Sequence, residues 1–236
     1  MDAQVARLVD KAWERFQQTP KDHRFMIAIG GIPGSGKTTL SKRVTRELNA
    51  RHARLHPEDA GPIAAFVPMD GYHLTRAQLS AMPDPAAALA RRGAEFTFDG
   101  AAFLALVRAL RRPVGGETVL APSFDHAVGD PRPGDIAVRP GHRAVVLEGN
   151  YVALDAGPWR EAAALFDERW FVDVDFAVAR RRLVARHVAA GLARDAREAA
   201  RRADENDLVN GRLIVENRVP VHEVIVSCDD DAWRHE

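Results

Sequence analysis

The sequence contains a single cysteine, Cys228, among its 236 residues. One cysteine excludes a disulfide framework and a cysteine metal cluster, and it is compatible with a reducing compartment. No apolar run approaches the length of a membrane span. Asp2, Asp10 and Glu14 make the first segment unlike a signal peptide or a transit peptide. We therefore expect a cytoplasmic protein without a membrane partner.

Net charge is absent as well, because 33 Lys and Arg residues balance 33 Asp and Glu residues. Proteins dedicated to binding nucleic acid need net or clustered positive charge, so we expect no nucleic-acid partner. Lysine is scarce, with four in the chain at Lys11, Lys21, Lys37 and Lys42. The sequence indicates no oligomeric state, and a homodimer is compatible with it.

A glycine-rich turn follows a short apolar run at residues 25–29 and opens a segment with a helical pattern. Residues 31–38 match G-x-x-x-x-G-K-[ST], the P-loop that surrounds nucleotide phosphates. Glycines let backbone N–H groups approach phosphate oxygens, and the positive end of the helix dipole points at the same oxygens. Lys37 would reach the β- and γ-phosphates, and the Thr38 hydroxyl would bind Mg²⁺. The residues expected to hold the nucleotide are Gly31, Pro33, Gly34, Ser35, Gly36, Lys37, Thr38 and Thr39.

Apolar runs and helical patterns alternate along the rest of the chain, which is typical of a parallel sheet in an α/β domain. We expect one domain over residues 1–236. The expected strands are 25–29, 63–68, 144–148, 170–174 and 224–226, and the expected helices are 5–16, 38–50, 103–110 and a long region over 176–217. Residues 119–141, rich in Pro and Gly, are expected to form a long loop or a hairpin.

Two carboxylates stand where apolar strands end, and ligands of such sheets bind at the carboxyl ends of the strands. Glu148 has the position of a carboxylate that binds Mg²⁺; the alternative is an ordinary acidic residue that binds nothing. Asp70 could orient an acceptor hydroxyl and take its proton, or it could simply form the turn before Gly71.

Further side chains could complete an acceptor site or a lid. Tyr72, His73, Asp125 and His126 are candidates for the acceptor site, although a lone histidine is more often structural.

Arg182 and Arg186 share one helix face, and with Arg194 they could fold over the triphosphate and neutralise transition-state charge. The alternative for these arginines is a solvated basic face.

Three segments together resemble the uridine kinase, phosphoribulokinase and pantothenate kinase group of P-loop kinases: residues 31–39, Met-Asp-Gly-Tyr-His at 69–73 and Val-Leu-Glu-Gly-Asn-Tyr at 146–151. The resemblance implies a three-layer αβα P-loop NTPase fold with a five-stranded parallel sheet and a helical lid. It also implies ATP as donor, Mg²⁺ as cofactor, Asp70 as catalytic base and Glu148 as the acidic residue near the metal.

The resemblance extends to residues 92–99, which include Phe98, and to residues 124–126, which are similar to acceptor-binding segments of that group. It places acceptor-binding insertions at about 71–99 and 121–142 and the lid at about 176–205. Uridine kinases carry a Tyr-Asp or similar pair where this chain has Phe124-Asp125-His126, so the resemblance does not assign uridine as the acceptor.

Two classes of function are consistent with these patterns. The first is a kinase that phosphorylates a hydroxyl of a small acceptor: a nucleoside-like molecule first, a sugar or a pantothenate-like alcohol second. The second is an ATPase without a small-molecule acceptor, for which Asp70 has no evident use. A GTPase is disfavoured, because no lysine follows an asparagine as the guanine-binding motif requires.

Overall fold

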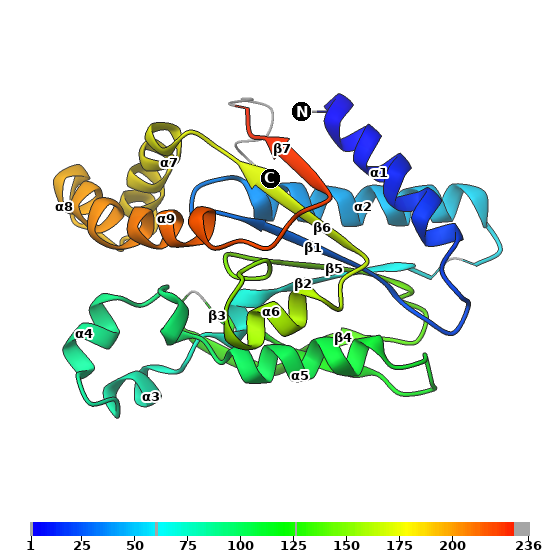
Figure 1. Cartoon of the computed structure of the whole chain (residues 1–236), viewed down its shortest axis with the longest axis horizontal. Helices are drawn as coiled ribbons and strands as arrows, with labels where there is room; N and C mark the ends of the chain where they lie inside the picture. The colour runs from blue at the N-terminus through cyan, green and yellow to red at the C-terminus, as the bar shows by residue number, and fades with distance from the viewer. Residues whose placement is uncertain (1, 60, 126, 229–236) are drawn as a thin grey trace.

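The computed structural model describes residues 2–59, 61–125 and 127–228. A five-stranded sheet lies at its centre (Figure 1), and every pair of neighbouring strands in it is parallel. The strand order is β2-β5-β1-β6-β7. These strands are β1 Phe25–Gly31, β2 Ala64–Pro68, β5 Ala144–Gly149, β6 Glu168–Asp173 and β7 Glu223–Val226. The predicted α/β fold with five parallel strands is confirmed.

Side chains of β1 alternate between two cores, as strand geometry requires. Phe25, Ile27 and Ile29 pack with α1 (Asp2–Gln17) and α2 (Lys37–Leu55) on one face. Met26 and Ala28 pack on the other face with α5 (Gly100–Arg111) and α6 (Gly157–Ala163). Both faces of the strand are therefore buried, which explains why β1 is a continuous apolar run.

Helix α2 is longer than the prediction of 38–50 and continues to Leu55. The reason lies in its last turns, where His52 is buried and lies against Trp13 of α1, with ring centroids 6.4 Å apart. Contact with α1 thus extends the helix into a segment that is polar in sequence.

An ion-pair cluster holds α1 to the sheet. Lys11 Nζ lies 3.1 Å from Glu168 Oε2 and 2.9 Å from Glu223 Oε1, and Arg7 lies 2.9 Å from Glu223 Oε2. Glu168 is buried and also accepts a hydrogen bond from the Trp170 indole N–H. The cluster joins the helix to the start of β6 and to β7.

The chain leaves the sheet twice to build the two predicted insertions. After β2 it forms the 3₁₀ turn η1 (Met69–Tyr72), α3 (Arg76–Ser80), α4 (Pro85–Ala90) and the 3₁₀ turn η2 (Glu95–Thr97). The region expected to be a loop or a hairpin is a hairpin, β3 (Val119–Asp125) paired antiparallel with β4 (Asp130–Val138). Asp99 caps α5 by accepting a hydrogen bond from Ala102 N–H.

Four helical segments replace the single long region expected over 176–217. They are α7 (Phe176–Ala189), α8 (Ala196–Arg202), the π-helical turn η3 (Ala203–Asp207) and α9 (Leu208–Glu216). Gly191, at φ 66, lies between α7 and α8, in a left-handed conformation that suits glycine. Helices α7 to α9 lie at the same end of the molecule as α3 and α4 (Figure 1).

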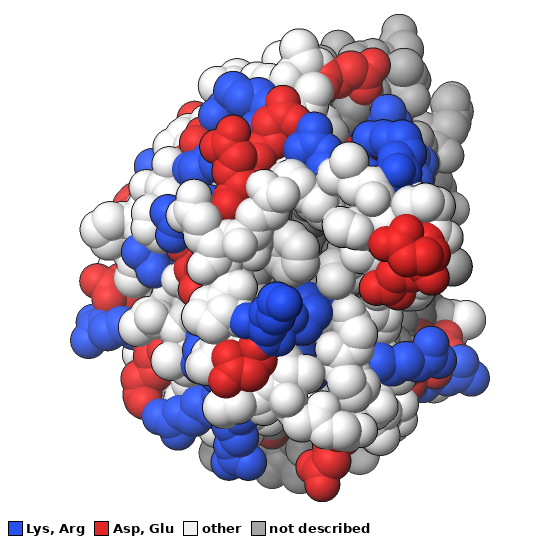
Figure 2. All heavy atoms as spheres, turned by 90° about the vertical axis from the view of Figure 1, so that its right-hand side faces the viewer, with Lys and Arg blue, Asp and Glu red and all other residues white. Residues whose placement is uncertain are grey.

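The face shown in Figure 2 carries interspersed basic and acidic side chains, in keeping with the balanced composition. Over the described residues, no helix is both long enough and apolar enough to cross a membrane.

Candidate active site

Strand register brings the predicted residues to one edge of the sheet. Glu148 pairs with Ile29 of β1 and with Pro68 of β2, so all three lie at the same level. The P-loop leaves β1 just beyond this level, and Asp70 follows two residues after Pro68. Segments far apart in the chain therefore meet at the carboxyl ends of three adjacent strands.

Glycines shape the P-loop in two ways. Gly34 and Gly36 have φ values of 80° and 90°, which side chains rarely adopt. At Gly31 a Cβ would lie 2.6 Å from Ser35 Oγ and 2.9 Å from the Val172 carbonyl oxygen. The loop ends at the N-terminus of α2, whose first amides and dipole favour an anion.

Lys37 and Glu148 face one another in this edge, with Nζ 4.0 Å from Oε1. Burial raises the pKa of Glu148 to about 7, although the Lys37 ammonium and a hydrogen bond with Thr38 act in the opposite direction. Burial lowers the pKa of Lys37, while the charges of Glu148 and Asp70 act to raise it. Asp70, Glu148, Lys37 and Thr38 therefore form one electrostatic cluster.

His73 is oriented by its neighbour in the same turn. Its Nδ1 lies 2.9 Å from the Asp70 carbonyl oxygen, and because a carbonyl only accepts, Nδ1 carries the proton. The imidazole packs at a tilt against Phe98 and Phe124, with centroid distances of 3.9 and 4.8 Å. His73 and Phe98 therefore lie together, as the prediction of an acceptor site requires.

Arg92 braces the wall formed by these rings. Its guanidinium donates hydrogen bonds to the carbonyl oxygens of Gly129 and Leu74 and to the Asp130 carboxylate. It also lies 5.4 Å from the centre of the Phe124 ring. One side chain thus joins the first insertion to the hairpin.

Two other residues predicted for the acceptor site, Tyr72 and Asp125, make contacts that stabilise the fold. Tyr72 is buried in the core edge-to-face with Phe103, and burial raises the pKa of its hydroxyl. Asp125 accepts hydrogen bonds from the N–H groups of Ala127 and Val128, so it stabilises the hairpin turn. His126 lies outside the described residues.

The three arginines predicted for the lid lie in different environments. Arg186 is exposed and lies near enough to lower the pKa of Lys37. Arg194 pairs with Glu198 on the surface. Arg182 donates to the carbonyl oxygens of Gly34 and Ser35 in the P-loop. Of these three arginines, Arg182 contacts the P-loop and Arg186 acts electrostatically on Lys37.

Sequence reasoning missed three polar residues around the site. Asp207 acts electrostatically on Lys37 and pairs with the buried His187, with Oδ2 2.9 Å from Nε2. Asn150, two residues after Glu148, has a buried Oδ1 that finds no hydrogen-bond partner among the residues that the structure describes. A buried acceptor of this kind needs a donor, and a ligand hydroxyl is one. No local motif marks Asp207 or His187, because only the fold brings them together.

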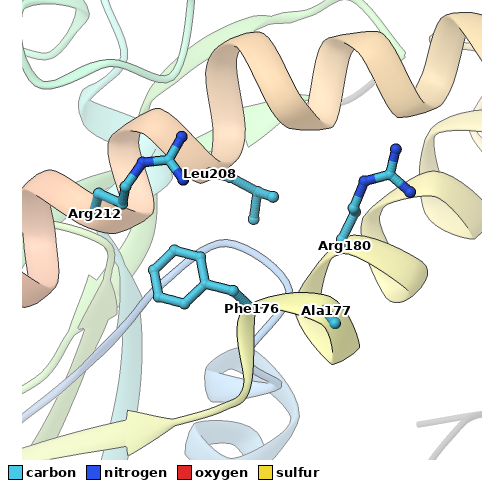
Figure 3. Close-up of a pocket in the computed structure, with 5 residues that line it drawn as sticks. All are labelled: Phe176, Ala177, Arg180, Leu208 and Arg212. Carbon is cyan, nitrogen blue, oxygen red and sulfur yellow. The ribbon is translucent and has the colours of Figure 1, made fainter.

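A separate hollow of about 340 Å³ lies between the start of α7 and α9 (Figure 3). Phe176 and Leu208 form its apolar part, with Arg180 and Arg212 at its edges. The Arg180 guanidinium is already paired with both oxygens of Asp204, at 2.7 and 2.8 Å. None of the predicted site residues lines this hollow.

Comparison with known proteins gives named relatives. No protein-family model matches the chain. The chain is 55% identical over 159 residues to "ATP-dependent kinase-like protein notR'" of Aspergillus versicolor, a match that covers 66% of this chain and 92% of that protein. It is 37% identical over 220 residues to a "Putative uridine kinase" of Schizosaccharomyces pombe, a match that covers 93% of this chain and 90% of that protein.

Solved structures similar to this chain include another protein named as a kinase. A "putative fructose transport system kinase" from Silicibacter sp. TM1040 is 36% identical with a TM-score of 0.79, over 93% of this chain and 98% of that chain. YFH7 from Saccharomyces cerevisiae superposes with a TM-score of 0.84 over 96% and 99%, and at 21% identity it shows a shared fold.

Proposed function

The chain belongs to the family of ATP-dependent P-loop kinases that these relatives represent, and on that premise we propose that it transfers the γ-phosphoryl group of ATP to a hydroxyl of a nucleoside-like small molecule. The observation that carries the proposal is the convergence of Asp70 and Glu148 on Lys37 at the mouth of the P-loop. An ATPase needs to position only water, so the second carboxylate favours a kinase.

The donor set at this edge fits Mg²⁺. Mg²⁺ prefers oxygen ligands, and the Thr38 hydroxyl and the Glu148 carboxylate are already joined by a hydrogen bond. The described residues contain no group of three or more His, Cys, Asp or Glu side chains suited to a metal. Thr38 and Glu148 would therefore hold the ion together with phosphate oxygens, where it would neutralise charge on the transferring group.

Asp70 is the residue we assign to the acceptor hydroxyl. Its carboxylate would accept a hydrogen bond from the hydroxyl and take the proton as the acceptor oxygen bonds to the γ-phosphorus and ADP leaves. Lys37 would hold the β- and γ-phosphates, and Arg186 would add positive charge from α7. These roles rely on positioning and charge stabilisation.

The rings around His73 support a nucleoside-like acceptor over a sugar. Phe124 and His73 are both partly exposed, and aromatic faces bind planar rings well. A sugar or a pantothenate-like alcohol is the second candidate, since the name of one relative refers to fructose. In either case residues 71–99 and 121–142 would bind the acceptor, and residues 176–205 would close over the nucleotide.

An acceptor panel tests the proposal. Protein with MgATP would be incubated with nucleosides, ketoses, aldoses and pantothenate, and phosphorylated products would be identified by mass. We expect a phosphorylated nucleoside-like product with the wild type and far less of it with Asp70→Asn. ATP loss that yields no phosphorylated acceptor and is unchanged by Asp70→Asn would contradict the proposal and support an ATPase.

A further inference from the structure

Arg182 is the side chain that joins α7 to the nucleotide loop. Its Nη1 donates to the carbonyl oxygen of Gly34 at 3.2 Å and makes a longer contact of 3.4 Å with that of Ser35. It also donates to Ser227 Oγ at 2.9 Å, and its Nη2 donates to the Cys228 carbonyl oxygen at 3.3 Å. One guanidinium thus binds the P-loop and the segment after β7 together.

The bonds of Arg182 are to the carbonyl side of the loop. A P-loop binds phosphate through its N–H groups, so its carbonyl groups must find partners elsewhere. The Ser35 carbonyl belongs to the same peptide unit as the Gly36 N–H. A cation that binds the carbonyl polarises this unit and makes its N–H group a stronger donor to an anion.

Close packing supports the same contact. A Cβ at Gly34 would lie 2.8 Å from the Ala179 carbonyl oxygen and 3.1 Å from a side-chain carbon of Leu183. The first turns of α7 therefore touch the loop directly. Gly36 faces the other partner of Arg182, since its Cβ position lies 3.7 Å from Ser227 Oγ.

We propose that Arg182 is a positioning residue: it holds the P-loop in its phosphate-binding shape through the loop's own carbonyl groups and makes no direct contact with the transferring phosphate. This inference rests on the proposed function, because it concerns the site that would bind ATP. It also divides the predicted lid. The part of α7 up to Leu183 belongs to the nucleotide-binding body, and closure begins beyond it.

The test compares the binding of two nucleotides by calorimetry, with no acceptor present. If Arg182 acts through the loop, Arg182→Ala lowers the affinity for ADP and for a non-hydrolysable ATP analogue alike, by roughly ten- to a hundredfold. Arg182→Lys gives an intermediate loss, because a single ammonium cannot reproduce the planar fork. Arg54→Ala, which alters an exposed arginine in the last turn of α2, serves as the matched control and binds like the wild type.

A second measurement separates a change confined to the P-loop from a loss of overall folding. Hydrogen exchange of residues 32–38 in nucleotide-free protein should be faster in Arg182→Ala than in Arg54→Ala, while the cores of both proteins exchange alike. If Arg182→Ala does not fold, Arg182→Lys carries the same comparison.

Two results would overturn the inference. Unchanged ADP affinity in Arg182→Ala would remove the loop-holding role. A loss confined to the ATP analogue, with kcat reduced at saturating ATP, would show that the side chain contacts the γ-phosphate. Failure of the proposed function is distinct, because it would appear in the acceptor panel, whereas the comparison of nucleotide affinities between wild type and Arg182→Ala needs no acceptor.

Discussion

Lys37 is surrounded by charges of both signs: the carboxylates of Glu148, Asp70 and Asp207 act to raise its pKa, and Arg186 acts to lower it. Each carboxylate can be assigned a different task because each comes from a different element. Glu148 shares a hydrogen bond with Thr38, whereas Asp70 is linked through its carbonyl to His73. The two amide variants should therefore differ: Asp70→Asn should affect phosphoryl transfer, and Glu148→Gln should affect the Mg²⁺ requirement.

Asp70→Asn should retain ATP binding and lose phosphoryl transfer. The amide keeps the size of the carboxylate but cannot take a proton, so we expect kcat to fall by a factor on the order of 10²–10⁴. Steady-state kinetics with the acceptor found in the panel, together with calorimetric binding of ATP, would measure both effects. Transfer at the wild-type rate would remove Asp70 from the role of base.

Glu148→Gln should raise the Mg²⁺ concentration that half-maximal activity requires. A neutral amide binds a hard dication less strongly than a carboxylate does. A Mg²⁺ titration at constant ATP would show the shift, and Glu161→Gln, which alters an exposed acidic residue of α6, is the control. Superimposable titrations of the wild type and Glu148→Gln would count against metal binding by Glu148.

The sequence predicted those residues that lie inside local motifs. Lys37 and Thr38 belong to the P-loop pattern, and Glu148 stands at the end of an apolar run. Asp207 could not be found this way, because its link to the site depends on the turn η3 and on His187, 20 residues away. Tyr72 also stands in a motif, and the structure places it in the core against Phe103, so its part in acceptor binding stays a prediction.

Elements are held at the site by close contacts between backbones as well as by side chains. At Gly71 in η1, an added Cβ would lie 2.1 Å from the Pro122 carbonyl oxygen of β3. Neither atom belongs to a flexible side chain, so the two elements would have to separate. Gly71 thus sets the distance between the turn that carries Asp70 and the hairpin.

Gly71→Ala should therefore destabilise the protein by about 1–3 kcal/mol, the usual cost of overpacking. Urea unfolding would measure the free-energy change. Gly115→Ala, at a position with no heavy atom within 4 Å, is the matched control and should change stability little. Equal stability of the two variants would show that η1 and β3 can move apart at no cost.

The anchoring of α1 should depend on acid pH. Hydrogen bonds from Arg7 and Lys11 lower the pKa of Glu223 to about 2. A carboxyl with a lowered pKa stabilises the fold above its unfolded pKa of about 4.3, and this contribution is lost as the pH falls toward about 2. Glu223→Gln should therefore destabilise the protein at pH 7 and lose its effect near pH 2.

Thermal unfolding of the wild type and Glu223→Gln across this range would check the sign. A difference in stability that grows as the pH falls would contradict the argument. High salt should reduce the difference at pH 7, because the Arg7 partner of Glu223 is more than half exposed.

The boundaries of the strands agree with the apolar runs in the sequence. The boundaries of the helices after β6 do not. The five strands appear where they are predicted, because each is a short apolar run between turns. The break after α7 falls at Gly191, whereas the turn η3 could not be read from the sequence, because residues 203–207 contain no glycine or proline that would mark it. There the tertiary contacts of Asn206 and His187 set the path of the chain.

At the scale of the whole molecule, the nucleotide loop is continuous with both cores. Ile32 packs in the core that contains α5 and α6, while Leu40 of α2 packs in the other. A ligand at the loop therefore restrains both layers at once. We expect nucleotide binding to stabilise the described fold as one unit.

MgATP at a hundred times its Kd should stabilise the protein by about 2.7 kcal/mol and raise its Tm by roughly 5–10 °C. Calorimetry would show a single transition that moves with nucleotide concentration. Lys37→Ala should show a much smaller shift, because the phosphate-binding ammonium is gone. A wild-type Tm that is insensitive to MgATP would contradict nucleotide binding at this loop.

Main-chain carbonyl groups accept several of the hydrogen bonds that hold residues 71–99 and 121–142 in place. Arg92 binds the carbonyls of Gly129 and Leu74, Asn206 binds that of Arg92, and the Tyr151 hydroxyl binds that of Gly93. Every residue supplies a carbonyl, whatever its side chain. If the rings of His73, Phe98 and Phe124 bind the acceptor, as we propose, their replacement would change acceptor preference while these hydrogen bonds persist. On that proposal, a few substitutions would be enough to change the acceptor between related enzymes, and the names of two relatives refer to uridine and to fructose.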